Sequence, residues 1–417
     1  MSLYGALFAG VSGLAAQSNA MGMISDNIAN VNTVGYKRLE ARFSSLVTQE
    51  TTLTQHSPGG VTASPYSRVE QQGLLQGSSS GTDLAIAGEG FFVVHEQANP
   101  VLGSNFLFTR AGSFNPDKNG DLQNAAGYYL QGYNLQTNPN PPPSASTLSG
   151  LETVNVSNLS GSAMPTQSIS LVANLPSASN VGDSFGVTTQ IFDSLGNAHD
   201  FVINFQKTGV NAWDYSVSDP TSLGVTTGTG AGDGSITFNT DGSLQTLTAS
   251  TPFGVTGWTT GAADSAFTVD TGTVGNTDGL SQFAGDFTIA DIEQDGVRFG
   301  VFTGVTIDES GLVTALFDNG QRLEIYRLPL ASFNNPNALG GVTGNAYLQT
   351  DQSGNFQLNL AGNSGAGLIS PSSLESSTVD LAEEFTNMII TQRAYSASAR
   401  TITTADDMLE ELMRIRR

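Results

Sequence analysis

The stretch from Ser376 to Arg417 carries apolar residues at alternating steps of four and three, and this repeat restricts the possible folds more than any other feature. A repeat of 3.5 residues keeps one face of a helix against another helix along its whole length. The helix would be roughly 50 Å long at 1.5 Å per residue, too long to bury itself in a small core. The stripe is interrupted at two positions, and its members are Leu381, Phe385, Met388, Gln392, Tyr395, Ala399, Ile402, Asp406, Leu409 and Met413.

The start of the chain offers a partner for this helix. Leu7, Leu14, Met21 and Ile28 recur at every seventh residue, and the pattern ends in an Asn/Gly break at 32–35. Several glycines weaken this helix, each by about 1 kcal/mol relative to alanine; they are Gly5, Gly10, Gly13 and Gly22.

Two interpretations of the terminal helices follow. The first is an intrachain helical hairpin that closes a globular domain. The second is that both ends become ordered only when several copies pack together. The glycine content and the length of the C-terminal helix favour the second interpretation. We also expect Ser377 and Asp380 to form a capping box at the start of that helix.

Composition points to many short strands. Of the 417 residues 12% are charged and 48 are glycine, which is typical of strands joined by turns. The net charge is −22, and Lys207 is the only basic residue between Lys118 and Arg298. Such a surface repels nucleic acid and anionic membranes.

The sequence predicts neither disulfides nor a conventional route of secretion. Cysteine is absent. No basic residue precedes Lys37, so the usual secretory signal is missing, and no run of 18 apolar residues could span a membrane. A dedicated export route would fit this combination.

We expect a mixed, mainly β fold, with N- and C-terminal α-helices paired as a coiled coil and two nested antiparallel β domains. Alternating residues such as Phe201, Ile203 and Phe205 predict strands, and Asp241-Gly242 predicts a hairpin turn. The expected domains are 1–35 with 371–417 (helical), 36–80 (extended connector), 81–145 with 289–370 (inner β) and 146–288 (outer, acidic β).

No motif predicts catalysis, a metal site or a cofactor. The three histidines, at 56, 95 and 199, lack the spacing of metal ligands. Asp117, Asn119 and Asp121 match the first positions of a calcium loop, but the glycine and the glutamate of that loop are missing. The segment 77–81 matches G-x-S-x-G without a strand before it, so we interpret it as a loop.

Four motifs resemble the bacterial flagellar rod and hook family. They are SDNIANVNTVGYK at 25–37, GTDLAIAGEGFF at 81–92, FTRAGSF at 108–114 with GYYLQGY at 127–133, and LESSTVDLA at 374–382 with QRAY at 392–395. Thr378 stands where the family usually has Asn. The motif positions that the resemblance marks are Asn27, Asn30, Asn32, Thr33, Gly35, Tyr36, Gln392, Arg393 and Ala394.

This resemblance implies a subunit of the hook, the flexible tube that joins rod to filament and transmits torque for motility, because rod members are shorter and lack an outer domain. It implies a helical homopolymer, contacts with the distal rod, hook cap, hook–filament junction and type III export proteins, and an extracellular location reached without a cleaved signal peptide. A rod-type protein, a secreted adhesin and a glycan-cleaving enzyme remain alternatives. The positions expected in the assembly seam are Leu7, Leu14, Met21, Ile28, Leu381, Phe385, Met388, Tyr395, Ile402, Leu409 and Met413.

Overall fold

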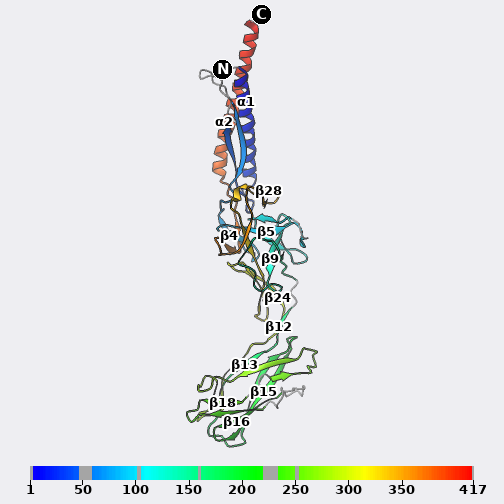
Figure 1. Ribbon diagram of the computed structural model, residues 1–417, viewed down its shortest axis with the longest axis vertical. Helices are drawn as coiled ribbons and strands as arrows, with labels where there is room; N and C mark the ends of the chain where they lie inside the picture. Colours follow the sequence, from blue (N-terminus) through cyan, green and yellow to red (C-terminus); the bar gives the residue numbers. More distant parts are fainter. Residues whose placement is uncertain are drawn as a thin grey trace. The chain divides into compact units, whose positions relative to one another are not determined.

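The computed structural model describes residues 3–46, 59–100, 105–157, 161–218, 233–248 and 253–415 (Figure 1). The chain divides into two compact units. The terminal unit comprises 1–158, 305–315 and 323–417, and the inserted unit comprises 159–304 and 316–322. In connectivity the inserted unit therefore interrupts the terminal unit.

The terminal unit contains both long helices and most strands of the largest sheet. Its elements are α1 (Leu3–Ala29), β1 (Leu39–Ser45), β2 (Val61–Ser67), β3 (Leu75–Gly77), β4 (Leu84–Ala87), β5 (Phe91–His95), β6 (Leu107–Thr109), β7 (Phe114–Pro116), β8 (Leu122–Asn124), β9 (Tyr129–Asn134), β10 (Ser144–Ala145), β11 (Leu151–Thr153), β27 (Pro329–Ser332), η1 (Pro336–Ala338), β28 (Gly340–Val342), β29 (Ala346–Leu348), β30 (Gln357–Leu360), β31 (Leu368–Pro371), β32 (Ser373–Glu375) and α2 (Leu381–Ile415).

The inserted unit is built from strands. They are β12 (Ser162–Met164), β13 (Ser168–Asn174), β14 (Ser184–Phe192), β15 (Ala198–Gly209), β16 (Ala212–Ser218), β17 (Asp233–Phe238), β18 (Leu244–Thr248), β19 (Phe253–Val255), β20 (Ser265–Asp270), β21 (Leu280–Ser281), β22 (Thr288–Gln294) and β23 (Val297–Gly300). The points of division fall in or beside β24 (Phe302–Ile307), β25 (Leu312–Phe317) and β26 (Arg322–Arg327).

Antiparallel pairing dominates the terminal unit. Its main sheet runs in the order β10-β30-β27-β5-β9-β26-β25-β24. A core of large side chains lies on β5 and its neighbours, where the rings of Phe91 and Tyr347 meet edge to face at 6.0 Å. Short pairs, β3 with β32 and β4 with β31, join the two ends of the chain beside this sheet.

The inserted unit packs two five-stranded sheets around one core. One sheet has the order β14-β15-β16-β17-β18 and the other is centred on β13. On β15, Phe201, Ile203 and Phe205 are buried while the residues between them are more exposed, as the alternation in the sequence predicted. The hairpin turn expected at Asp241-Gly242 joins β17 to β18.

The boundaries of the two units differ from the expected domain boundaries. Residues 146–157 were expected in the outer domain, but β11 pairs with β9 of the main sheet. Residues 289–300 were expected in the inner domain, but β22 pairs with β13 and β23 pairs with β12. Amino-acid composition changes gradually along the chain and therefore does not locate a boundary. Backbone hydrogen bonding, in contrast, passes from one sheet to another between two consecutive strands. The expected connector, 36–80, also contains a regular antiparallel pair, β1 with β2.

Candidate functional site

The two terminal helices pack against each other, antiparallel, through small residues of α1. A Cβ added to Gly10 would lie 2.8 Å from Cγ1 of Ile402, and one added to Gly13 would lie 3.1 Å from Oγ of Ser398. Helix axes can approach closely only where the facing side chains are small. These two glycines therefore shape the contact, whereas the sequence predicted only that they weaken the helix. Gly22 has open space beside it.

The contact face of α2 is shifted relative to the apolar stripe expected from the sequence. Its fully buried residues are Glu384, Thr391 and Ala405. The seam positions Leu7, Leu14, Met21, Ile28, Met388, Ile402 and Leu409 are half-buried. The remaining four are exposed, namely Leu381, Phe385, Tyr395 and Met413. Their role in assembly is taken up below as a proposal.

Large apolar side chains also remain exposed on α1. Tyr4, Phe8 and Val11 are exposed by 76%, 57% and 56%. Their spacing of four and three places them on one face of the helix. Isolated apolar residues are common on protein surfaces, but a contiguous row on a long helix marks an interaction surface.

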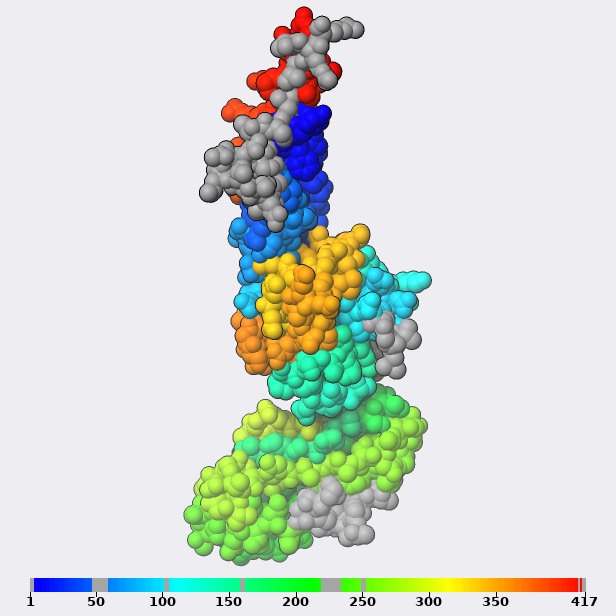
Figure 2. All heavy atoms as spheres, turned by 45° about the horizontal axis from the view of Figure 1, so that its top comes forward, coloured from blue at the N-terminus to red at the C-terminus, as the bar shows by residue number. Residues whose placement is uncertain are grey.

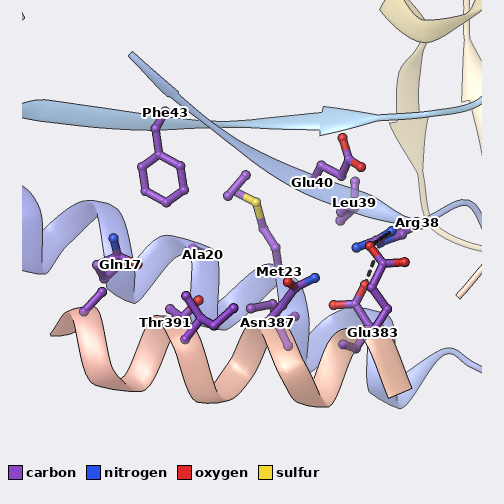
Figure 3. A pocket seen from close by; sticks show the side chains of 15 residues that line it. Gln17, Ala20, Met23, Arg38, Leu39, Glu40, Phe43, Glu383, Asn387 and Thr391 are labelled. Atoms are coloured by element: carbon purple, nitrogen blue, oxygen red, sulfur yellow. Dashed lines mark ion pairs between the residues drawn. The ribbon is translucent and has the colours of Figure 1, made fainter. Parts of the chain in front are cut away.

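A groove lies between α1, α2 and the strand β1 (Figure 3). Its volume is about 380 Å³. Met23 of α1 and Phe43 of β1 line it, and Phe43 is half exposed. The groove belongs to the terminal unit and is open at its rim, where Arg38 pairs with Glu383 at 2.8 Å.

The N-terminal motif fixes the turn that follows α1. The Asn27 amide donates to the carbonyl of Leu39 at 2.8 Å and its oxygen accepts the amide N–H of Leu39 at 2.9 Å, so this side chain pairs with the backbone as a strand would. The hydroxyl of Tyr36 donates to the same oxygen at 3.2 Å. Burial raises the pKa of Tyr36 to about 12, with the charges of Asp26 and Glu384 adding to it.

Gly35 cannot be replaced by a residue with a side chain without strain. Its φ is +68°, and a Cβ would lie 2.7 Å from the backbone nitrogen of Ala111. Two other motif residues of this turn are linked by a hydrogen bond within it. The Thr33 hydroxyl donates to the side-chain oxygen of Asn30 at 3.1 Å, and Asn32 is exposed.

A buried charged cluster ties the ends of the chain to the sheet. Lys37 and Glu375 form an ion pair with both side chains fully buried, and Arg110 lies 3.4 Å from the second carboxylate oxygen. The N–H of Gly73 donates to Glu375 at 2.7 Å. Burial lowers the pKa of Lys37 to about 8, although Glu375 acts in the opposite direction. Nothing in the sequence shows that these three residues meet, because they lie far apart along the chain.

The start of α2 differs from the expected capping box. Asp380 itself is the N-cap, and its carboxylate accepts the N–H groups of Ala382 at 2.8 Å and Glu383 at 3.3 Å. The helix therefore begins at Leu381. Thr378 accepts the N–H of Arg38 at 2.9 Å, which links this turn to the N-terminal segment. In the QRAY motif at 392–395, Gln392 and Arg393 are exposed and Ala394 is half-buried.

In the described part of the chain, no group of histidine and acidic side chains could hold a metal ion. Neither described helix has a stretch that is apolar enough to cross a membrane. The calcium-like loop is a turn, in which Asp117 accepts the N–H groups of Asn119 and Asp121 at 2.8 and 3.0 Å.

Sequence models of flagellar proteins match four parts of the chain. They are the flagella basal body rod protein at 7–37, the flagellar hook protein FlgE/F/G D1 domain at 85–166, the flagellar basal body protein FlaE D2 domain at 173–297 and the flagellar basal body rod FlgEFG protein C-terminal at 370–415. The flagellar hook protein FlgE of Rhizobium meliloti is 37% identical over the full length of both chains. This chain belongs to the flagellar hook protein FlgE family.

Other members of the FlgE family extend the comparison. The flagellar hook protein FlgE of Brucella suis is 36% identical, with both chains covered completely. That of Escherichia coli is 29% identical, with 97% of this chain and 98% of the relative covered. The crystal structure of Helicobacter pylori flagellar hook protein FlgE2 shares the fold, with a TM-score of 0.51, 14% identity and 72% of this chain and 100% of that chain covered.

Proposed function

We propose that copies of this chain assemble, through their terminal helices, into the flexible helical tube of the flagellar hook, which links rod to filament and transmits torque. The end-to-end similarity to flagellar hook proteins carries the proposal. The similarity includes the D2 domain, which favours the hook over the rod alternative. Distal rod, hook cap, hook–filament junction and type III export proteins are the proposed partners, and export without a cleaved signal peptide is the proposed route.

The exposed apolar residues of the paired helices are the proposed assembly surface. Burying a phenylalanine removes it from water at a gain of about 1.5–3 kcal/mol. In the part of the chain that the structure describes, the exposed row of α1 and the exposed seam positions of α2, such as Phe8 and Phe385, are uncovered, and another copy would cover them. The half-buried positions of the seam would hold the pair together inside each copy.

Electron microscopy of the purified protein tests this proposal. We expect tubes from the full-length chain, grown on seeds sheared from isolated hooks, and only monomers from a variant that lacks 381–417. If the truncated chain extends the seeds equally well, the β-strand units drive assembly and the terminal helices do not. In cells, the protein should localise beyond the outer ring of the basal body, whereas a rod protein would remain within it.

A point variant gives a finer test. Phe385→Ser should leave the monomer folded, because Phe385 is 50% exposed, and should raise the critical concentration for assembly. Phe283→Ser, at a similarly exposed phenylalanine of the inserted unit, is the matched control. Equal effects of the two variants would contradict a special role for the helices.

Protease digestion tests the second interpretation of the termini. If the ends become ordered chiefly on assembly, 1–30 and 380–417 should be cleaved rapidly in dilute monomer and protected in tubes. Full protection in the monomer would instead support the self-contained helical hairpin.

A further inference from the structure

The two arginines in the middle of α2 have no acidic partner on their own helix. Side chains three and four positions apart are neighbours on a helix surface. At those distances Arg393 and Arg400 have only apolar or neutral neighbours: Ile389, Ile390, Ser396, Ala397, Thr403 and Thr404. The acidic residues of α2 lie further away along the helix, at Glu383 and Glu384 in its first turn and from Asp406 onward. Within the described ranges of the chain, no ion pair involves either arginine.

The partner helix cannot neutralise these arginines either. α1 carries no charged residue from Leu3 to Ser25. Both arginines are exposed, and so are Asp407 and Glu410 near the C-terminal end of α2. This end extends beyond the start of α1 (Figures 1 and 2).

These charges share one side of the helix. Arg393, Arg400 and Asp407 are spaced by seven residues, so they lie on one face, and Glu410 follows Asp407 on the next turn. Thr391 and Ala405 are buried on a different side, toward α1. The exposed side of α2 therefore presents a basic section followed by an acidic section. Arg414 comes seven residues after Asp407 and pairs with Glu411 of its own helix at 3.2 Å.

We propose that Arg393 and Arg400 of one copy form ion pairs with Asp407 and Glu410 of a neighbouring copy. Copies in a helical tube are related by rotation about its axis and translation along it, so helices that lie along that axis run in the same direction. The centres of the two sections are 12 residues apart on the sequence, so the neighbour is displaced by roughly 18 Å along the helix axis. This inference rests on the proposed function, because it requires that copies assemble.

The charge order makes the contact directional. In register, Arg393 would face Arg393 and Asp407 would face Asp407, and like charges brought together in an interface are costly. With the stagger, the basic section of each copy meets the acidic section of the next. Such a head-to-tail contact joins two different surfaces and produces an open helical polymer rather than a closed dimer.

Charge reversal with rescue tests the pairing. The variants are R393E/R400E, D407K/E410K and the combination of all four substitutions, each added to seeds sheared from isolated hooks at low salt. We expect each double variant to raise the critical concentration at least about tenfold, or about 1.4 kcal/mol per added copy. The fourfold variant should restore assembly, because it exchanges the basic and acidic sections. The effects should shrink at 1 M salt, where the Debye length is about 3 Å.

R298E/R322E is the matched control, since it makes the same change in net charge at two exposed arginines of the inserted unit. Assembly of R393E/R400E at the wild-type concentration overturns the pairing. Failure of the fourfold variant to recover also overturns it, as does an equal effect of R298E/R322E. If the wild type does not extend the seeds, the proposed function fails, and the pairing fails with it.

Discussion

Glu375→Gln should destabilise the terminal unit strongly. The carboxylate of Glu375 is fully buried and lies against Lys37, the N–H of Gly73 and Arg110. Glutamine keeps the size of the side chain but removes the negative charge. Two cations, Lys37 and Arg110, would then share a buried site without a counter-charge.

The size of the effect follows from this arrangement. Removing one partner of a buried ion pair costs about 3–5 kcal/mol, mainly because the remaining charge stays desolvated. With a urea m value of about 3 kcal/mol/M, the midpoint of the transition should fall by about 1–1.7 M. The lowered pKa of Lys37 allows part of the loss to be relieved at high pH, where its amine becomes neutral.

The chain itself supplies the assay and an internal control. Its two tryptophans, Trp213 and Trp258, both lie in the inserted unit. Tryptophan fluorescence therefore follows unfolding of that unit, while helical circular dichroism follows α1 and α2. We expect Glu375→Gln to shift the circular dichroism transition and to leave the fluorescence transition unchanged.

Glu383→Gln is the matched substitution on the surface. Glu383 also pairs with an arginine, Arg38, but its side chain is 54% exposed. Exposed ion pairs contribute about 0–1 kcal/mol, so its transition should hardly move. If Glu375→Gln shifts the circular dichroism midpoint no more than Glu383→Gln does, the buried cluster does not stabilise the terminal unit and the reasoning is refuted.

Three further experiments test individual contacts. Gly10→Leu should weaken helix pairing by about 1–3 kcal/mol through overpacking, whereas Gly22→Leu, with open space beside it, should leave helicity equal or higher; helical circular dichroism compares them. Asn27→Ala leaves the N–H and carbonyl of Leu39 without partners and should cost about 1–3 kcal/mol in urea unfolding. Burial alone would raise the pKa of Asp193, but hydrogen bonds, chiefly from Asn197 and Thr260, lower it to about 2. The inserted unit should therefore lose stability as the pH falls from about 4 toward 2, and tryptophan fluorescence should show this loss reduced in Asp193→Asn.

Local patterns predicted the elements well. Phe201, Ile203 and Phe205 alternate in the sequence and are buried together on β15. The turn at Asp241-Gly242 was predicted because its residue types suit a tight hairpin. Both long helices were predicted because an apolar repeat continued over many turns could hardly form anything else.

The phase of the helix contact could not be predicted from hydrophobicity. The residues of α2 that are buried include Glu384 and Thr391, which are polar, while Phe385 beside them is exposed. A search for apolar stripes selects the large side chains, but this contact depends on small residues of α1 such as Gly10 and Gly13. The side that packs within the chain and the side that is most apolar are therefore different.

The buried charged cluster escaped prediction for another reason. Charged residues usually lie on the surface, so an isolated Lys37 or Glu375 gives no local sign of burial. Each becomes part of a core only because the segment that follows α1 lies against β32. There the N–H of Gly35 donates to the carbonyl of Glu375 at 2.8 Å, and Lys37 meets a residue 338 positions away in the sequence. Pairing over such a distance is a property of the whole fold.

The glycines of α1 connect folding of the terminal helices to assembly. Gly10 and Gly13 have no side chain to bury, so this part of the contact gains less from burial than a contact between large apolar side chains would. The large apolar residues of both helices, such as Phe8 and Phe385, are left outside that contact. A neighbouring copy that covers them would add the burial that the single chain lacks. Under the proposed function, the arrangement that limits burial within one chain would therefore favour polymerisation.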